Sequence, residues 1–191
     1  MNVLIINGHP GKDTFNHALA NAFKKGAQKT SVSLKTLEVY DMKLRLDMTG
    51  FNKEKAIPEN ILKAQGMIAW ADHLVWIYPT WWSTMPAMLK AFFEQVFISG
   101  FAFEYKQSTQ VVKWDKFLKG KSAQIISTMD SPPWYYKLFV GDPGFKTVKD
   151  IMNFCGIKPV KRTYFGSVKV STEKQRQKWL DKAEQLGRKL K

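Results

Sequence analysis

The sequence predicts an α/β domain in which helices cover both faces of a parallel β-sheet. Five short β-type runs alternate with stretches of helical periodicity, as expected when a crossover helix follows each strand. The first run, Val3-Leu4-Ile5-Ile6, is apolar at every position, which is typical of a strand buried on both faces. A chain of 191 residues with 45% hydrophobic residues can form one sizeable core, so we expect a single domain over residues 1–191.

The expected strands are short apolar runs between turn-forming residues, and they cover 2–7, 32–39, 73–78, 123–128 and 160–165. The expected helices lie between and after them, at 16–29, 58–70, 86–97, 142–154 and 172–190. The first helix follows from the spacing of Leu19, Phe23 and Ala27, and the second and third begin at prolines. The last carries an apolar stripe that includes Trp179 and Ala183. The order of elements up to the fifth strand is therefore βαβαβαβαβ, and the last helix follows that strand.

Two longer connections, residues 41–55 and 99–114, lack this periodicity. Long connections in a compact α/β domain are usually functional. The second carries Phe101, Phe103 and Tyr105, and we expect these rings to offer apolar surface to a partner.

The net charge of +14 is the one unusual feature of the composition. Residues 1–112 carry 12 Lys or Arg against 9 Asp or Glu, whereas residues 113–191 carry 18 against 7. The cations are dispersed rather than gathered in one motif, so a solvated basic surface is the first interpretation and attraction of phosphorylated cofactors the second. Nucleic acid is not the expected partner.

The sequence also indicates a compartment. Lys90 and Glu94 interrupt the longest apolar stretch, residues 74–103, so no membrane span is expected, although peripheral contact with a membrane stays open. The apolar run at residues 2–7 is too short for a signal peptide and has no basic leader. Cys155 has no cysteine partner in the chain, and its apolar neighbours predict a buried, inert thiol. We expect a cytoplasmic protein.

Residues 8–16 form a loop that joins the first strand to the first helix and contains Gly8 and Gly11. Backbone N–H groups and the helix dipole at such a junction favour a phosphate, and Thr14 and Asn16 can add side-chain donors. A plain turn with a capped helix and no ligand is the alternative. The loop is not a dinucleotide G-x-G-x-x-G motif, and Gly120-Lys121-Ser122 is not a P-loop because it precedes a strand.

The third strand ends in polar and aromatic residues, including Trp81 and Trp82. Open α/β sheets bind ligands beyond the carboxyl ends of their strands, and indole rings there can flank a planar heterocycle. Tryptophan pairs more often fill cores, but the neighbours Thr80, Ser83 and Thr84 indicate exposure.

The fourth strand ends in the same way, in the polar and then aromatic residues 127–136, so three strand ends are expected to converge on one site. No metal site is predicted, since His9, His17 and His73 lack metal-ligand spacing. We interpret His17 and His73 as structural or solvated residues.

These motifs resemble those of the flavodoxin-like NAD(P)H:quinone oxidoreductases, a group that includes quinone reductases and ancillary subunits of potassium-efflux systems. The resemblance covers nearly the whole chain. It is carried by Gly8-His9-Pro10 with Thr14-Phe15-Asn16-His17, by Tyr78-Pro79-Thr80-Trp81-Trp82 with residues 86–94, by Phe101-Ala102-Phe103 and by Phe154-Cys155-Gly156.

The resemblance implies a three-layer, flavodoxin-like sandwich whose five parallel strands have the order 2-1-3-4-5. It also implies a flavin site. The flavin phosphate and ribityl chain would be held by His9, Thr14, Phe15 and Asn16. The isoalloxazine would be lined by Pro79, Thr80, Trp81, Trp82 and Ser83, and its pyrimidine edge would meet Thr128, Met129 and Asp130.

The chain departs from this group in two places. Met129-Asp130 stands where animal quinone reductases have two glycines, and residues 134–145 contain no histidine. No catalytic acid or base is therefore assigned to the protein. Ser99-Gly100 stands where an acidic residue helps to seat the adenosine of FAD, so FMN is expected, with FAD as the alternative.

The resulting hypothesis is a homodimeric flavoenzyme that takes hydride from NADH or NADPH and passes it through FMN to a quinone or similar acceptor, in a ping-pong cycle. Trp82, Trp134 and Tyr135 are the expected acceptor pocket, and backbone N–H groups near Trp81, Trp82 and Met129 are expected to stabilise charge on the ring. The alternative is a flavin- and nucleotide-binding regulatory subunit of a membrane potassium-efflux transporter. An electron-carrying flavodoxin fits poorly, because such carriers are usually acidic.

Overall fold

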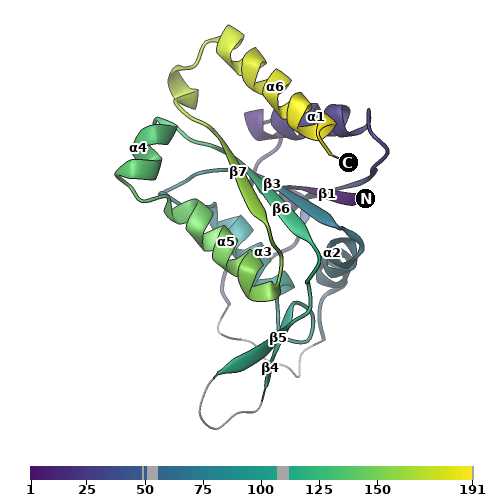
Figure 1. Ribbon diagram of the computed structural model, residues 1–191. Coiled ribbons are helices and arrows are strands. Elements are labelled where there is room, and N and C mark those ends of the chain that lie inside the picture. The colour runs from purple at the N-terminus through teal and green to yellow at the C-terminus, as the bar shows by residue number, and fades with distance from the viewer. Residues whose placement is uncertain (49, 51–55, 107–111, 191) are drawn as a thin grey trace.

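The computed structural model describes residues 1–48, 50, 56–106 and 112–190. Five parallel strands form the main sheet, which Figure 1 shows between two layers of helices. These strands are β1 (Asn2–Asn7), β2 (Ser33–Glu38), β3 (His73–Pro79), β6 (Ser122–Thr128) and β7 (Val160–Phe165). The helices that cover them are α1 (Phe15–Ala27), α2 (Glu59–Trp70), α3 (Ala87–Val96), α5 (Pro143–Cys155) and α6 (Glu173–Arg188).

The five strands are arranged β2-β1-β3-β6-β7, which confirms the expected order 2-1-3-4-5 of the parallel sheet. Asn7 of β1 pairs with Ile77 of β3, and Pro79 of β3 pairs with Thr128 of β6. The carboxyl ends of the three central strands therefore reach the same edge of the sheet. No described helix is both long and apolar enough to cross a membrane.

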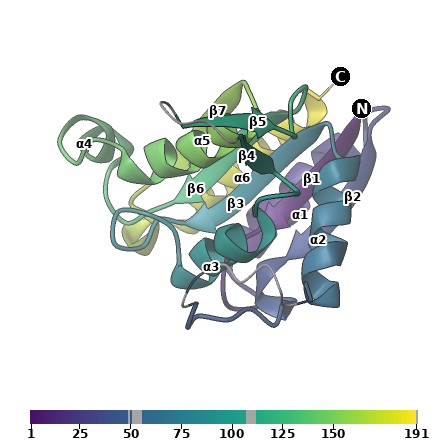
Figure 2. The same ribbon diagram turned by 90° about the horizontal axis from the view of Figure 1, so that it is seen from below.

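The apolar runs are buried on both faces because successive side chains of a strand point to opposite sides. Val3 and Ile5 pack against α1 and α6, whereas Leu4 and Ile6 pack on the side of α2, α3 and α5. Figures 1 and 2 show these helices on the two faces of the sheet. The two-sided burial inferred from the first strand is confirmed.

Helices α1 and α6 pack closely through two glycines. A Cβ atom on Gly26 would lie 1.9 Å from the carbonyl oxygen of Glu184, and one on Gly187 would lie 2.1 Å from that of Phe23. Any larger residue at either position would force the helices apart. This contact fixes the C-terminal end of α6 beside that of α1.

The expected loop over residues 99–114 is wrong in part. It contains β4 (Phe103–Lys106), which pairs antiparallel with β5 (Lys113–Lys116), although residues 107–111 lie outside the described part of the chain. Phe101 and Phe103 pack on the core, and the ring of Phe103 lies 4.9 Å from that of Phe154, so they offer less free surface than expected. The expected loop at residues 41–55 lies partly outside the described residues.

The sequence also did not predict three short helices. These are α4 (Pro133–Leu138) and the 3-10 helices η1 (Val39–Asp41) and η2 (Val168–Val170). Figure 2 shows α4 projecting beyond the carboxyl ends of β3 and β6. Residues expected to be an irregular connection there are thus presented by a helix.

Candidate functional site

Residues 8–16, named the β1 loop from here on, connect β1 to α1. Hydrogen bonds between residues close in sequence shape this loop. Asn7 Oδ1 accepts the N–H of His9 at 3.2 Å, and His9 Nδ1 accepts the N–H of Gly11 at 2.9 Å. Burial lowers the pKa of His9, which favours the neutral ring that this acceptor role requires. The backbone N–H groups of His9 and Gly11 are therefore not free to bind a ligand.

Thr14 caps α1 together with His17. Nδ1 of His17 accepts the N–H of Thr14 at 3.3 Å and lies 2.9 Å from the Thr14 hydroxyl. Nε2 of the same ring lies 3.3 Å from a carboxylate oxygen of Glu38, whose pKa is raised by burial. The Thr14 side chain, expected as a phosphate donor, is thus already committed to shaping the loop, and His17 has the structural role predicted for it.

The Asn16 side chain retains an unused donor. Its side chain is 3% exposed, and its Oδ1 accepts the Thr128 hydroxyl at 3.1 Å, while Nδ2 is buried without a hydrogen-bond partner. Among the described residues, the backbone N–H groups of Phe15 and Asn16 also have no acceptor, as expected in the first turn of a helix. Three unused donors at a helix N-terminus are an arrangement that can hold an anion.

The Phe15 side chain points elsewhere. Its ring lies 6.0 Å from that of Trp179 on α6, and the guanidinium of Arg176 lies 5.9 Å from its centre. Phe15 can therefore serve a phosphate only through its backbone. Its ring joins α1 to α6.

After β3 the chain forms a tight turn at residues 81–84, named the Trp82 turn from here on. Trp81 and Thr84 exchange both backbone hydrogen bonds, at 3.1 and 3.0 Å, and Trp82 and Ser83 have φ values of +48° and +65°. Such positive φ values at both central positions define a type I′ turn, which usually contains Asn or Gly. The Trp82 side chain is 100% exposed and that of Trp81 45%, so the exposure inferred from the sequence is confirmed.

An open groove of about 510 Å³ lies beside this turn. Its lining combines the turn with the start of α3 and one residue of α5, and consists of Trp81, Trp82, Thr84, Met85, Pro86, Ala87, Lys90 and Thr147. The expected acceptor residues Trp134 and Tyr135 do not line this groove. They are exposed on α4.

Contacts between side chains and backbone tie the three strand ends together. The rings of His9 and Trp81 lie 5.5 Å apart, which joins the β1 loop to the Trp82 turn. Thr80 donates its N–H to the carbonyl of Thr128 at 2.7 Å, and Thr128 in turn contacts Asn16. The structure thus brings together residues of the three strand ends that the sequence predicted to converge.

At the end of β6, two expected ring contacts are engaged within the protein. The Met129 side chain is buried and its N–H donates to the carbonyl of Phe165 at 2.9 Å. The Asp130 carboxylate accepts the N–H of Lys169 at 3.0 Å. Because the Trp81 N–H is also used, the expected set of free N–H groups near a ring reduces to that of Trp82, which has no acceptor among the described residues.

No sequence pattern singled out Tyr136, although its hydroxyl contacts the Trp82 turn. Residues 134–136 are all aromatic, and only the phase of α4 decides which ring is buried. Pro132 and Pro133 could have indicated the start of a helix. In a helix, consecutive residues point in different directions, so the three rings could not all be buried on one face. Tyr136 is 2% exposed, whereas Trp134 and Tyr135 face solvent.

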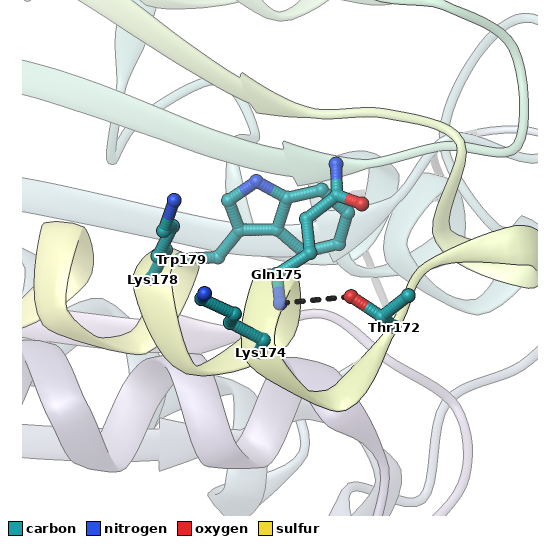
Figure 3. Close-up of a pocket in the computed structure, with 5 residues that line it drawn as sticks. All are labelled: Thr172, Lys174, Gln175, Lys178 and Trp179. Carbon is teal, nitrogen blue, oxygen red and sulfur yellow. Dashed lines mark hydrogen bonds between the residues drawn. The ribbon is translucent and has the colours of Figure 1, made fainter.

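A second hollow, of about 380 Å³, lies on α6 and is shown in Figure 3. Thr172, which caps this helix by accepting the N–H of Gln175 at 3.2 Å, lines it with Trp179 and two lysines. Trp179 also contacts Phe15, the first residue of α1, so the hollow lies close to the start of that helix. It is open and its lining comes from α6 and its cap alone.

The whole chain has relatives among named proteins. Residues 1–189 match the sequence model of a family described as having a flavodoxin-like fold. A Haemophilus influenzae protein named as an NAD(P)H oxidoreductase is 30% identical over 192 residues, covering 97% of this chain and 93% of the relative. NAD(P)H dehydrogenase (quinone) 1 of Cavia porcellus is 29% identical over 182 residues, covering 81% of this chain and 64% of the relative.

Solved structures have the same fold as this chain. A protein from Streptococcus mutans UA159 is 34% identical and superposes with a TM-score of 0.85, with 100% of both chains covered. The FMN-dependent NADH-azoreductase of Bacillus anthracis, solved in complex with FMN, is 17% identical and has a TM-score of 0.73 over 97% of each chain. The azoreductase therefore shares the fold.

Proposed function

Given that the chain belongs to the family with the flavodoxin-like fold, we propose that it is a flavin-dependent NAD(P)H oxidoreductase that reduces a quinone or a similar acceptor. One observation carries the proposal: three strand ends in contact bring the unused N–H donors at the start of α1 to the same edge of the sheet as two exposed indole rings. The relatives named as NAD(P)H oxidoreductases and quinone dehydrogenases support the same chemistry.

The residues present fit a flavin phosphate. The buried Nδ2 of Asn16 has no partner, and the N–H groups of Phe15 and Asn16 have no acceptor among the described residues. An unsatisfied buried donor is costly, so a bound phosphate would supply what this structure lacks. We propose FMN as the cofactor, held at its phosphate by these donors, with FAD as the alternative.

The remaining proposed contacts lie around this anchor. His9 and Thr14 shape the loop, Pro79, Thr80, Trp81, Trp82 and Ser83 line the ring, and Thr128, Met129 and Asp130 close its edge. Thr80 and Thr128 hold two strand ends in register through their hydrogen bond. A bound flavin supplies hydride acceptance from NAD(P)H and electron transfer to the acceptor. The protein binds the flavin, orients the reactants and excludes water from the site. No residue is assigned as an acid or base.

Donor and acceptor would use the open side of the site in turn. Trp82 stands wholly in solvent beside the groove and offers a flat apolar surface for a nicotinamide or a quinone. Trp134 and Tyr135 on α4 complete the proposed acceptor pocket. Turnover with NADH and with NADPH identifies the preferred donor.

We also propose a homodimer in the cytoplasm. Exposed apolar residues gather on α4 and the turn that follows it, at Trp134, Tyr135, Leu138, Phe139 and Val140. Such clusters on monomers usually meet a partner, and this one replaces residues 101–105 as the proposed contact surface. The free, buried Cys155, whose pKa burial raises to about 12, is the inert thiol expected and fits a reducing compartment. Light scattering of the flavin-bound protein gives the mass directly.

The test of function is a titration followed by a turnover assay. The purified protein should bind FMN with micromolar affinity or better and should then oxidise NADH or NADPH in the presence of a soluble quinone. A protein that binds neither FMN nor FAD at micromolar concentration would refute the proposal. Flavin binding without NAD(P)H oxidation would favour the regulatory-subunit alternative, which the names of the relatives do not support.

A further inference from the structure

The Tyr136 hydroxyl lies between two backbone segments far apart in the sequence. It donates to the carbonyl of Ser83 at 2.7 Å and accepts the N–H of Gly144 at 2.8 Å. The ring is 2% exposed, and burial raises the pKa of the hydroxyl, so it stays protonated and able to donate. A single side chain therefore connects α4, the start of α5 and the Trp82 turn.

The Trp82 turn needs such a support. Its two central residues, Trp82 and Ser83, have left-handed backbone conformations that non-glycine residues rarely adopt. Strained residues of this kind persist only where the surrounding structure holds them. The Trp82 side chain has no burial to hold it, since it is wholly exposed, so the constraint must act through the backbone of the turn.

Tyr136 is itself fixed from behind. Its carbonyl accepts the N–H of Asp142 at 3.1 Å, and its ring packs edge-on against Tyr164 at 5.7 Å. The buried Asp142 carboxylate pairs with Arg162 and accepts the Tyr164 hydroxyl, which ties the α4–α5 junction to β7. Gly144 leaves the space that this arrangement requires, because a Cβ there would lie 2.7 Å from the Tyr136 hydroxyl.

We propose that Tyr136 is a positioning residue that holds the Trp82 turn in its strained form and so sets the place of the Trp82 indole beside the site. The proposal rests on the proposed function, in which the Trp82 ring forms a wall for the nicotinamide and the acceptor. Tyr136 acts on the acceptor side of the site and leaves the phosphate anchor alone, because its contacts reach Ser83 and none of the residues 8–16.

Two variants test this, with one control for the loss of a tyrosine hydroxyl. Tyr136→Phe removes the hydroxyl and keeps the ring, and Gly144→Ala keeps the hydroxyl but drives a methyl group between it and the turn. Tyr105→Phe is the control, since Tyr105 is an exposed tyrosine on β4 whose hydroxyl has no hydrogen bond among the described residues. The readouts are amide hydrogen exchange of the flavin-free protein, the FMN dissociation constant, and steady-state kinetics with a soluble quinone.

The amides of Trp81 and Thr84 close the turn, so their exchange should become roughly tenfold faster in both variants, about the factor for one lost hydrogen bond. The amides of Gly11 and Thr14 should not change. The KM for the quinone should rise roughly 10- to 100-fold, because a misplacement of about 1 Å can cost about 10². The FMN dissociation constant should change less than about threefold, as expected if the anchor is untouched.

Unchanged exchange at Trp81 and Thr84 together with an unchanged KM would overturn the proposal. An FMN dissociation constant that rises as much as the KM would also overturn it, because Tyr136 would then support the whole site rather than Trp82. If the wild-type protein turns over no substrate, the proposed function fails. The exchange comparison still decides whether Tyr136 holds the turn.

Discussion

The β1 loop and the Trp82 turn are both connections at the carboxyl edge of the sheet, but they are held in opposite ways. In the β1 loop, Asn7, His9 and His17 accept backbone N–H groups two or three residues away. The Trp82 turn depends on Tyr136, whose hydroxyl bonds to a carbonyl 53 positions earlier in the chain. The hydrogen bonds that shape the β1 loop are local, whereas the hydrogen bond proposed to hold the Trp82 turn comes from α4.

This difference matches the work proposed for each region. A phosphate needs the same donors in every complex, so a loop shaped by its own residues suits an anchor for a cofactor. Trp82 is exposed and would meet ligands of different shape in turn, and its support lies on α4, which projects beyond the sheet edge. Changes in α4 would therefore alter acceptor preference while flavin binding persists.

The largest effect is expected from a variant that weakens the proposed phosphate anchor. Asn16→Ala removes a buried donor to a charged phosphate, a bond of about 1.5 to 3 kcal/mol, and should weaken FMN binding by roughly 10- to 150-fold. Asn21→Ala, an exposed asparagine on the same helix, is the control. Fluorescence titration measures both. Equal affinity in the two variants would place the phosphate elsewhere.

Trp82→Ala should separate function from stability. The side chain is wholly exposed, so its loss should change the free energy of unfolding by no more than about 0.5 kcal/mol. The kcat/KM for a quinone should fall by about tenfold or more, because a wall that orients the reactants is gone. Denaturant unfolding and steady-state kinetics measure the two. A large loss of stability with normal turnover would show that the Trp82 ring stabilises the fold and does not orient the reactants.

Acid should loosen the β1 loop and leave the Trp82 turn unchanged. Burial lowers the pKa of His9 below 6.5, so the neutral ring stabilises the loop above that pH, and this contribution is lost as pH falls through the lowered pKa. Protection of the Gly11 amide against exchange should then decrease, since Nδ1 can no longer accept its N–H. Protection of Trp81 and Thr84 should stay constant after correction for intrinsic rates. Parallel loss at both regions would show that they are not independent.

The smallest effect is expected from the neighbour of Tyr136. The half-exposed Tyr135 has no hydrogen bond to its hydroxyl among the described residues, so Tyr135→Phe should keep flavin reduction by NAD(P)H within about tenfold of wild type. Stopped-flow bleaching of the flavin gives the rate. A loss of ~10² to 10⁴ would instead identify Tyr135 as a general acid or base and would contradict a purely positional mechanism.

The amino-acid sequence by itself determined the five strands of the main sheet, the five long helices and the place of the candidate site. Apolar runs and helical periodicity are local signals, and β1 and β7 have the bounds that they predicted. The convergence of three strand ends followed from the rule that ligands lie beyond the carboxyl edge of a parallel sheet. The β1 loop was also accessible, because its supporting residues lie within the same short segment.

Only the tertiary structure decided which polar groups remain free and which aromatic ring supports the site. Thr14, Met129 and Asp130 looked available in sequence but are engaged by His17, Phe165 and Lys169. Tyr136 could not be told from Trp134 and Tyr135, because one helical phase buries the first and exposes the others. The hairpin of β4 and β5 was missed as well, although Phe103-Glu104-Tyr105-Lys106 alternates apolar and charged residues, because a run of four residues is at the short limit of that signal. Long-range contacts leave no periodic trace, so the pairing of distant residues emerges only when the chain is folded.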